Sequence, residues 1–122
     1  MGINYDQQHN IFHLKANESS YVLQLFKDKY LLHLYWGKRV ASSALDYLIR
    51  PTSRLFSPKL DPEKDYSLDI LPQEYPGYGN GDFRMPAFQV QLDNGSTVMD
   101  LRYQTHRILA GKSRLPGLPA TY

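Results

Sequence analysis

Hydrophobic and polar residues alternate along several parts of this chain with the two-residue period of β-strands. The clearest case is residues 87–92, where three apolar residues alternate with two glutamines, as in a strand with one buried face. Asn94 and Gly95 follow, and an Asn-Gly pair between alternating segments is a strong hairpin signal. The pattern therefore predicts a hairpin with a type I′ turn at Asn94-Gly95 and a return strand over residues 97–103.

Three apolar runs near the start of the chain also predict strands. They cover residues 11–14, 21–26 and 30–36 and are rich in the β-branched and aromatic residues that favour sheets. Three residues separate the last two runs, which is hairpin spacing. The run 30–36 is interrupted only by His33, so we expect it to be covered on both faces, with His33 as a packed sheet residue.

The remaining segments complete an all-β prediction. Residues 38–50 are the one candidate for a short helix, with Ser42 or Ser43 as its cap and Pro51 at its end. Residues 66–71 predict a brief extended segment, and residues 105–109 a further strand. The expected fold is an antiparallel β-sandwich or a large open sheet of about seven short strands.

A long loop separates the two halves of this pattern. Residues 69–87 contain three prolines, three glycines, three aromatic residues and four charged residues. Proline interrupts both helices and central strands, and long loops in compact domains are usually functional or disordered. The aromatic residues argue against disorder. Two interpretations stay open: an ordered connection whose aromatic residues plug one end of a core, which composition favours, or a functional loop.

Composition narrows the classes of function. The chain has 122 residues, enough for one domain, and 14 basic against 12 acidic residues give a net charge of +2. The basic residues form no cluster of the kind that binds nucleic acid. Cysteine is absent, which excludes disulfides, thiolate metal sites and thiol nucleophiles. The first residues are too polar for a signal peptide or a membrane span, so the expected location is the cytoplasm and no membrane partner is expected.

The candidate chemistry is limited. Six carboxylates lie between positions 61 and 82, and a pair of them could serve glycoside chemistry, although solvated loop charges are the simpler interpretation; they are Asp61, Glu63, Asp65, Asp69, Glu74 and Asp82. The four histidines lack metal-ligand spacing, and the glycine-rich residues 77–81 lack the lysine of a phosphate loop. No metal or cofactor is expected. Trp36 fits a sugar platform, an interface anchor or, most simply, a core residue.

Several short motifs together resemble one family. In chain order they are His33-Leu-Tyr-Trp-Gly37, Arg54-Leu-Phe-Ser-Pro58, Tyr66-Ser-Leu-Asp69, Leu71-Pro-Gln-Glu-Tyr-Pro76, Gly81-Asp-Phe-Arg84, Gln89-Val-Gln-Leu92, Asn94-Gly-Ser-Thr97, Asp100-Leu-Arg-Tyr103 and Gly117-Leu-Pro-Ala-Thr-Tyr122. This order resembles the amino-terminal domain of bacterial α-galactosidases, the melibiase-type enzymes of glycoside hydrolase family 36. The resemblance covers residues 12–122, and the long loop is its most specific part.

The resemblance implies a domain that is incomplete within residues 1–122. In that family the region opens a large β-supersandwich, and a catalytic (β/α)₈ barrel follows it. The two catalytic aspartates lie in the barrel, so no residue of this chain is expected to be catalytic and the isolated chain is expected to be inactive. The implied substrates are terminal α-galactosides of the melibiose and raffinose type. The family forms homotetramers in which the region matching Ser53 to Asp69 reaches a neighbour's active site.

Arg54 and Lys64 are the residues that the resemblance nominates for substrate binding. The family commonly has an aspartate where this chain has Ser53, and an arginine where it has Lys64. Lysine keeps the charge but loses the planar fork that binds bidentately. The sugar contacts that the family makes at these two positions are therefore expected to be altered in this chain. Two competing hypotheses remain: a free-standing carbohydrate-binding module that uses Trp36, Tyr75 and Tyr78, and an assembly domain without sugar contact.

Overall fold

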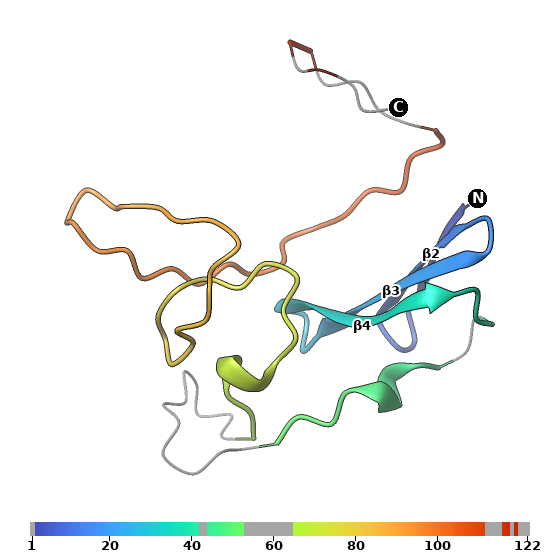
Figure 1. Cartoon of the computed structure of the whole chain (residues 1–122), viewed down its shortest axis with the longest axis horizontal. Coiled ribbons are helices and arrows are strands. Elements are labelled where there is room, and N and C mark those ends of the chain that lie inside the picture. Colours follow the sequence, from blue (N-terminus) through green and yellow to red (C-terminus); the bar gives the residue numbers. More distant parts are fainter. Residues whose placement is uncertain (1, 42–43, 53–64, 112–115, 118, 120–122) are drawn as a thin grey trace.

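The protein is an all-β, antiparallel structure, as the sequence predicts. A computed structural model describes residues 2–41, 44–52, 65–111, 116, 117 and 119. Its centre is one four-stranded sheet with the order β1-β2-β3-β4, formed by β1 (Gly2–Asp6), β2 (Ile11–Ala16), β3 (Ser19–Phe26) and β4 (Tyr30–Lys38). Two short 3₁₀ helices follow, η1 (Asp46–Leu48) and η2 (Leu68–Ile70), and the rest of the described chain wraps around or leaves the sheet (Figure 1).

One face of the sheet carries the main core. A first cluster contains Ile11, Val22 and Leu45, and a second contains Tyr30, Leu32, Tyr66, Leu68 and Leu71. Both draw on the strands and on the segments that include η1 and η2, so these two helical turns pack on the same side of the sheet (Figure 1). Burial of apolar surface, at about 25 cal/mol per Å², therefore holds residues 44–49 and 65–71 against the strands.

Residues 103–108 cross the opposite face of the sheet. The His106 ring lies edge-on to Tyr5 and Phe12, with ring centroids 4.6 and 4.7 Å apart. Tyr103 fixes this crossing through its amide, which donates to the Lys29 carbonyl at 2.7 Å. The contact covers only part of the face, because a groove of about 260 Å³ remains between the strands and residues 103–108.

The prediction of a short helix over residues 38–50 is wrong for the residues of this segment that the structure describes. Strand β4 continues to Lys38, and the Arg39 amide still donates to the Glu18 carbonyl at 2.7 Å. Beyond it the described residues form only the single turn of η1. Leu45 is buried against the sheet, so tertiary packing overrides the weak local helix propensity. The proposed caps Ser42 and Ser43 lie outside the described residues.

The predicted strands 87–92, 97–103 and 105–109 are not strands in the structure. Residues 87–99 instead form an extended arm that projects from the body of the molecule (Figure 1). A lone two-stranded hairpin is marginal in water, and alternation alone does not make a ladder without neighbouring strands. The apolar side chains of this region accordingly stay exposed: Phe88, Leu92, Val98, Leu101, Ile108 and Leu109.

The turn at the tip of the arm is real, but its type differs from the prediction. Gly95 donates to the Leu92 carbonyl at 2.8 Å, and Leu92 donates to the Ser96 carbonyl at 2.9 Å. Gly95 has a φ of +81°, whereas Asn94 is not among the residues with positive φ. A type I′ turn needs positive φ at both positions. The loop is therefore the three-residue kind, in which glycine in the left-handed region follows the turn.

Two further segments differ from the sequence-based expectation. The polar start of the chain forms β1, which pairs antiparallel with β2 from Gly2↔Lys15 to Asp6↔Ile11. Residues 66–71 contain the 3₁₀ turn η2 instead of being extended throughout. Among the described residues, no helix has the length and apolar character needed to cross a bilayer.

Candidate functional site

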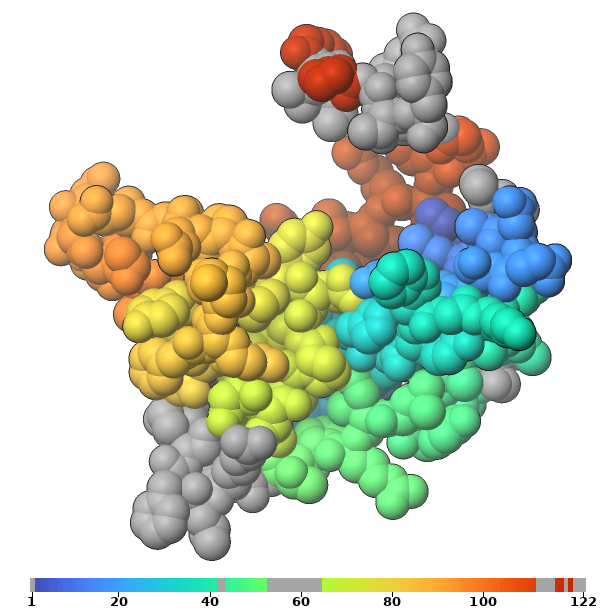
Figure 2. All heavy atoms as spheres, viewed as in Figure 1, coloured from blue at the N-terminus to red at the C-terminus, as the bar shows by residue number. Residues whose placement is uncertain are grey.

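The long loop is fastened to the outer edge of the sheet. His33 donates its amide to the Pro72 carbonyl at 2.8 Å, and Glu74 donates to the Leu31 carbonyl at 2.9 Å, so residues 72–74 add a short antiparallel pairing to β4. Figure 2 shows the yellow atoms of this part of the loop in contact with the turquoise atoms of β4 at the molecular surface. The loop is thereby an ordered structure positioned by β4.

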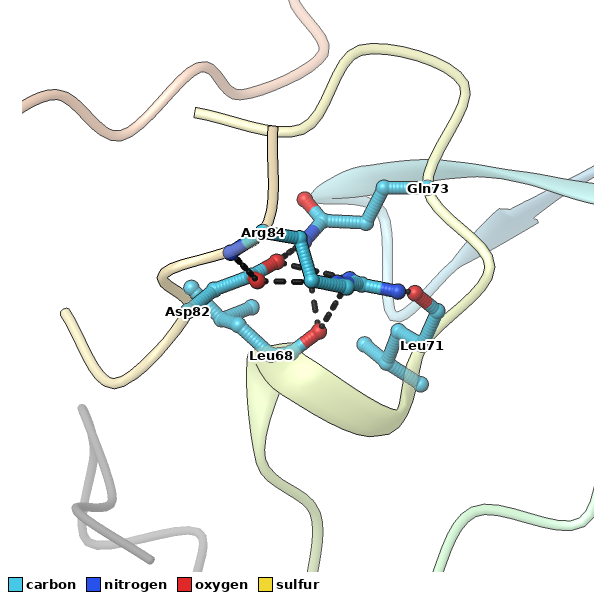
Figure 3. A network of polar contacts seen from close by, with 5 residues as sticks. All are labelled: Leu68, Leu71, Gln73, Asp82 and Arg84. Atoms are coloured by element: carbon cyan, nitrogen blue, oxygen red, sulfur yellow. Dashed lines mark hydrogen bonds and ion pairs between the residues drawn. The ribbon is translucent and has the colours of Figure 1, made fainter. Parts of the chain in front are cut away.

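An ion pair with a buried carboxylate closes the second half of the loop (Figure 3). Arg84 donates to Asp82 through Nε at 2.8 Å and through Nη2 at 2.6 Å. The same Nη2 also lies 2.9 Å from the carbonyl oxygens of Leu68 and Leu71. Hydrogen bonds to Asp82 raise the pKa of Arg84. The pair thereby ties the loop to η2.

Glycine at position 77 allows the loop to meet the projecting arm. A Cβ atom built on Gly77 would lie 2.5 Å from the backbone oxygen of Met99. Close by, Met99 donates its amide to the Tyr78 carbonyl at 3.1 Å. The glycine-rich run therefore serves backbone approach between two segments, and this explains glycine there without a phosphate-binding role.

A polar cluster lies where the loop meets the sheet. The Tyr21 hydroxyl donates to Glu74 Oε1 at 2.6 Å, and His33 Nδ1 lies 3.1 Å from the same oxygen. The Tyr21 and His33 rings are 5.2 Å apart between centroids. Burial, together with the neighbouring Glu74 carboxylate, raises the pKa of Tyr21 to about 12, so its hydroxyl remains a donor at neutral pH. His33 is thus a sheet residue that also binds the loop.

The aromatic residues singled out from the sequence lie at the surface. Trp36 is 77% exposed, so the interpretation of Trp36 as a core residue is wrong. Tyr75, Tyr78 and Phe83 are 62%, 39% and 68% exposed, so they do not plug a core either. The position of a residue near a strand end does not reveal which face is covered, and the sequence offers no other signal for Trp36.

The nominated substrate-binding residues, Arg54 and Lys64, lie outside the described residues, as does Ser53. Of the six carboxylates, Asp61 and Glu63 also lie outside them. Asp65 pairs with Lys27 at 2.9 Å, and its hydrogen bond to that lysine lowers the pKa of Asp65. Glu74 and Asp82 are engaged as described above. In the part of the chain that the structure describes, no group of three or more histidine and acidic residues is placed to hold a metal ion.

Sequence reasoning missed the Tyr21–Glu74–His33 cluster. Tyr21 and Glu74 are 53 positions apart, and neither belongs to a local motif that signals the contact. Only the docking of residues 72–74 on Leu31 and His33 of β4 brings them together, and the one-dimensional pattern does not show this contact.

Comparison with known proteins places this chain in a family. The model described as the glycosyl hydrolase family 36 N-terminal domain matches residues 29–122. Alpha-galactosidase AgaA of Geobacillus stearothermophilus is 57% identical over 123 residues, which cover 100% of this chain and 17% of AgaA. The bifunctional alpha-galactosidase/sucrose kinase AgaSK of Mediterraneibacter gnavus is 39% identical over 125 residues, covering 100% of this chain and 13% of that protein.

Solved structures agree with the sequence comparisons. The crystal structure of the family 36 alpha-galactosidase AgaB from Geobacillus stearothermophilus superposes with a TM-score of 0.88 and 58% identity, covering 100% of this chain and 16% of that chain. Substituted forms of AgaA have been solved with 1-deoxygalactonojirimycin and with raffinose, each at a TM-score of 0.81, 59% identity, and 92% and 16% coverage. The chain thus spans about one sixth of the length of the relatives it matches.

The similarity extends over the sheet, the loop and the arm alike, because the matched relatives cover the whole chain at high identity. The family expectation drawn from the sequence motifs is therefore confirmed. This chain belongs to the glycosyl hydrolase family 36 N-terminal domain family.

Proposed function

We propose that this chain is the non-catalytic N-terminal portion of an α-galactosidase that hydrolyses terminal α-galactosides of the melibiose and raffinose type. The observation that carries this proposal is the 57% identity to an alpha-galactosidase across the whole chain. In this proposal a catalytic barrel follows residue 122 in the complete polypeptide and holds the nucleophile and the acid/base. The complete enzyme works in the cytoplasm without a cofactor.

Three carboxylates among the described residues support a non-catalytic role, because each is held in an ion pair. Asp82 is committed to Arg84, Asp65 to Lys27 and Asp100 to Arg102. A retaining glycosidase needs two carboxylates on opposite sides of one sugar, whereas these three are separately engaged in ion pairs. Full-length enzyme should hydrolyse raffinose and a chromogenic α-galactoside, and 1-deoxygalactonojirimycin should inhibit it. The isolated chain should release no product, and turnover that survives rigorous repurification of the isolated chain would contradict the proposal.

The same proposal gives the domain a role in a neighbouring subunit's active site. The complete enzyme assembles as a homotetramer, and the segment around Arg54 and Lys64 lies at the rim of a partner's barrel and contacts the oligosaccharide. Support comes from the family membership and from the chemistry of arginine and lysine, which donate charged hydrogen bonds to hydroxyl groups. Light scattering of the full-length enzyme should give the mass of four subunits.

Subunit mixing tests the rim role. Arg54→Ala should weaken kcat/KM for raffinose by about ten- to a hundredfold, the loss expected for one charged contact of about 1.4–3 kcal/mol. When this variant is mixed with subunits whose barrel nucleophile is removed, hybrid tetramers pair intact barrels with intact Arg54 and regain activity. Activity that merely averages the two parents would place Arg54 in its own subunit or outside the site.

A further inference from the structure

A β-bulge in β4 brings two separated side chains to the same face of the sheet. Residues three apart in a regular strand point to opposite faces. Here the register shifts between Val22 and Leu23, so that His33 pairs with Leu23 while Trp36 pairs with Tyr21. Since Tyr21 and Leu23 are two apart in β3, His33 and Trp36 share one face. Bulges are common next to functional sites, where they re-aim a side chain.

Glu74 completes this arrangement with an oxygen that can still accept. Its Oε1 atom receives both Tyr21 and His33, whereas the described part of the chain provides no hydrogen bond to Oε2. The Glu74 side chain is 18% exposed, so Oε2 is accessible and yet held in position. Tyr21 connects the two ends of the cluster, because it is the cross-strand neighbour of Trp36 and the donor to Glu74.

We propose that Trp36, Tyr21 and Glu74 form a surface subsite that binds a hexopyranosyl unit of an α-galactoside oligosaccharide. The apolar C–H face of the sugar stacks on the indole of Trp36, and Glu74 Oε2 accepts a sugar hydroxyl. The assignment of the sugar to the α-galactosides rests on the function proposed above. Stacking on an aromatic ring and acceptance by a fixed carboxylate do not depend on it.

The surroundings of Trp36 favour a sugar over a protein partner. Tryptophan anchors many protein interfaces, but the buried centre of an interface is depleted in charged residues, glutamate among them. Here Trp36 is the cross-strand neighbour of Tyr21, which donates to the Glu74 carboxylate, and the His33 ring also contacts that carboxylate. A pyranose presents both an apolar face and hydroxyl donors, and so it matches this combination of groups.

The test uses the full-length protein with its barrel saturated by 1-deoxygalactonojirimycin. Stachyose is then added, and saturation-transfer NMR reports which sugar protons touch the protein. We expect a signal at galactosyl protons in the blocked wild type. Trp36→Ala should weaken the apparent affinity about tenfold or more, the order expected for one lost aromatic contact. Trp36→Phe should retain part of the signal, and Glu74→Gln should reduce it while leaving the stacking partner in place.

Tyr47→Ala is the matched control. Tyr47 is 62% exposed but lies in η1, on the opposite side of the sheet, so its removal should leave the stachyose signal unchanged. A blocked wild type without any galactosyl signal would overturn the subsite. A Trp36→Ala variant that keeps the signal would also overturn it. Loss of the signal together with dissociation of the assembly, as measured by light scattering, would overturn it too, since Trp36 would then anchor a subunit contact.

Failure of the subsite is distinguishable from failure of the proposed function. Raffinose hydrolysis by the unblocked wild type tests the enzyme, whereas the saturation-transfer signal of the blocked protein tests the surface. An active enzyme without the signal removes only the subsite. An inactive protein that still shows a signal abolished in Trp36→Ala removes the proposed enzyme and leaves a sugar-binding surface.

Discussion

Asp82 and Arg84 form a forked ion pair in which the side chain of the carboxylate is only 1% exposed while that of the arginine is 44% exposed. Gln73 adds a hydrogen bond of 3.2 Å to the same carboxylate, and the arginine reaches on to two carbonyl groups near η2 (Figure 3). The pair thus fixes the loop by satisfying a buried charge and two backbone acceptors at once.

Arg84→Ala should destabilise the chain strongly. The substitution removes both charged hydrogen bonds to the buried carboxylate, which keeps only the Gln73 amide and the backbone amide of residue 84 as donors, and this loss costs about 2–4 kcal/mol in the free energy of unfolding. Arg84→Lys should fall between wild type and alanine, because lysine keeps the charge but cannot form the fork. Urea denaturation measures the differences. Equal stability of Arg84→Ala and wild type would show that the pair contributes little to the fold.

Replacing Gly95 should loosen the tip of the projecting arm. Its φ of +81° is unfavourable for a β-branched residue, and no atom lies within 4 Å of an added Cβ. The effect of Gly95→Val therefore comes from backbone strain alone, on the order of 1 kcal/mol or more. We expect the Leu92 amide to exchange its hydrogen about tenfold faster.

Gly2→Val serves as the control for this prediction. Gly2 also has open space around an added Cβ, and its φ is not in the left-handed region. The Leu92 amide should therefore exchange at the wild-type rate in Gly2→Val. Unchanged Leu92 exchange in Gly95→Val as well would argue against the turn.

The sequence pattern predicted best those strands that lie next to each other in the chain. Residues 11–14, 21–26 and 30–36 all fall within β2, β3 and β4, because each apolar run meets its partner through a short turn. Residues 87–109 carry the same kind of pattern and form no strand in the structure. Alternation of apolar and polar residues indicates that one face of a segment can be buried. It does not show whether another strand lies beside that segment to pair with it.

The site was predictable only where partners are close in sequence. Asp82 and Arg84 are opposite charges two residues apart, so their pairing is a local contact. The contact of Tyr21 with Glu74 depends on docking of the loop on β4, and the exposure of Trp36 depends on which part of that edge the loop leaves uncovered. Neither property is encoded in local spacing. The resemblance to a family indicated Arg54 and Lys64, whose roles stay predictions.

Stability should fall as pH decreases through the titration of His13. This residue is buried on the core face and hydrogen-bonded to Ser20 at 2.8 Å. Burial, and then the charges of Lys15 and Arg39, lower the pKa of His13 below 6.5. The unfolded chain therefore takes up the proton first. Stability is fully present above about pH 6.5 and is lost as pH falls toward the lowered folded-state pKa.

Urea midpoints between pH 7.5 and about 5.5 measure this effect. The window lies above the range in which ordinary carboxylates titrate, so Asp6 and Asp65, whose pKa values are lowered by hydrogen bonds to His9 and Lys27, contribute little to the slope. His13→Phe should flatten the pH dependence, even if its midpoint differs from wild type at every pH. A slope that is the same in both proteins would exclude His13 as its source.

Gly77→Ala should separate the loop from the arm. The added methyl group would approach the Met99 carbonyl oxygen, which is a backbone atom and cannot rotate away. The hydrogen bond from the Met99 amide to Tyr78 and the one from Ala87 to Pro76, at 3.1 and 2.9 Å, should both weaken as the segments move apart. We expect a loss of about 1–3 kcal/mol, the range for overpacking, and faster exchange of the Met99 amide. Gly2→Ala adds the same methyl group where nothing lies within 4 Å and should change stability by less than about 0.5 kcal/mol. If both variants match wild type, the loop and arm do not depend on this approach, and glycine at position 77 serves another purpose.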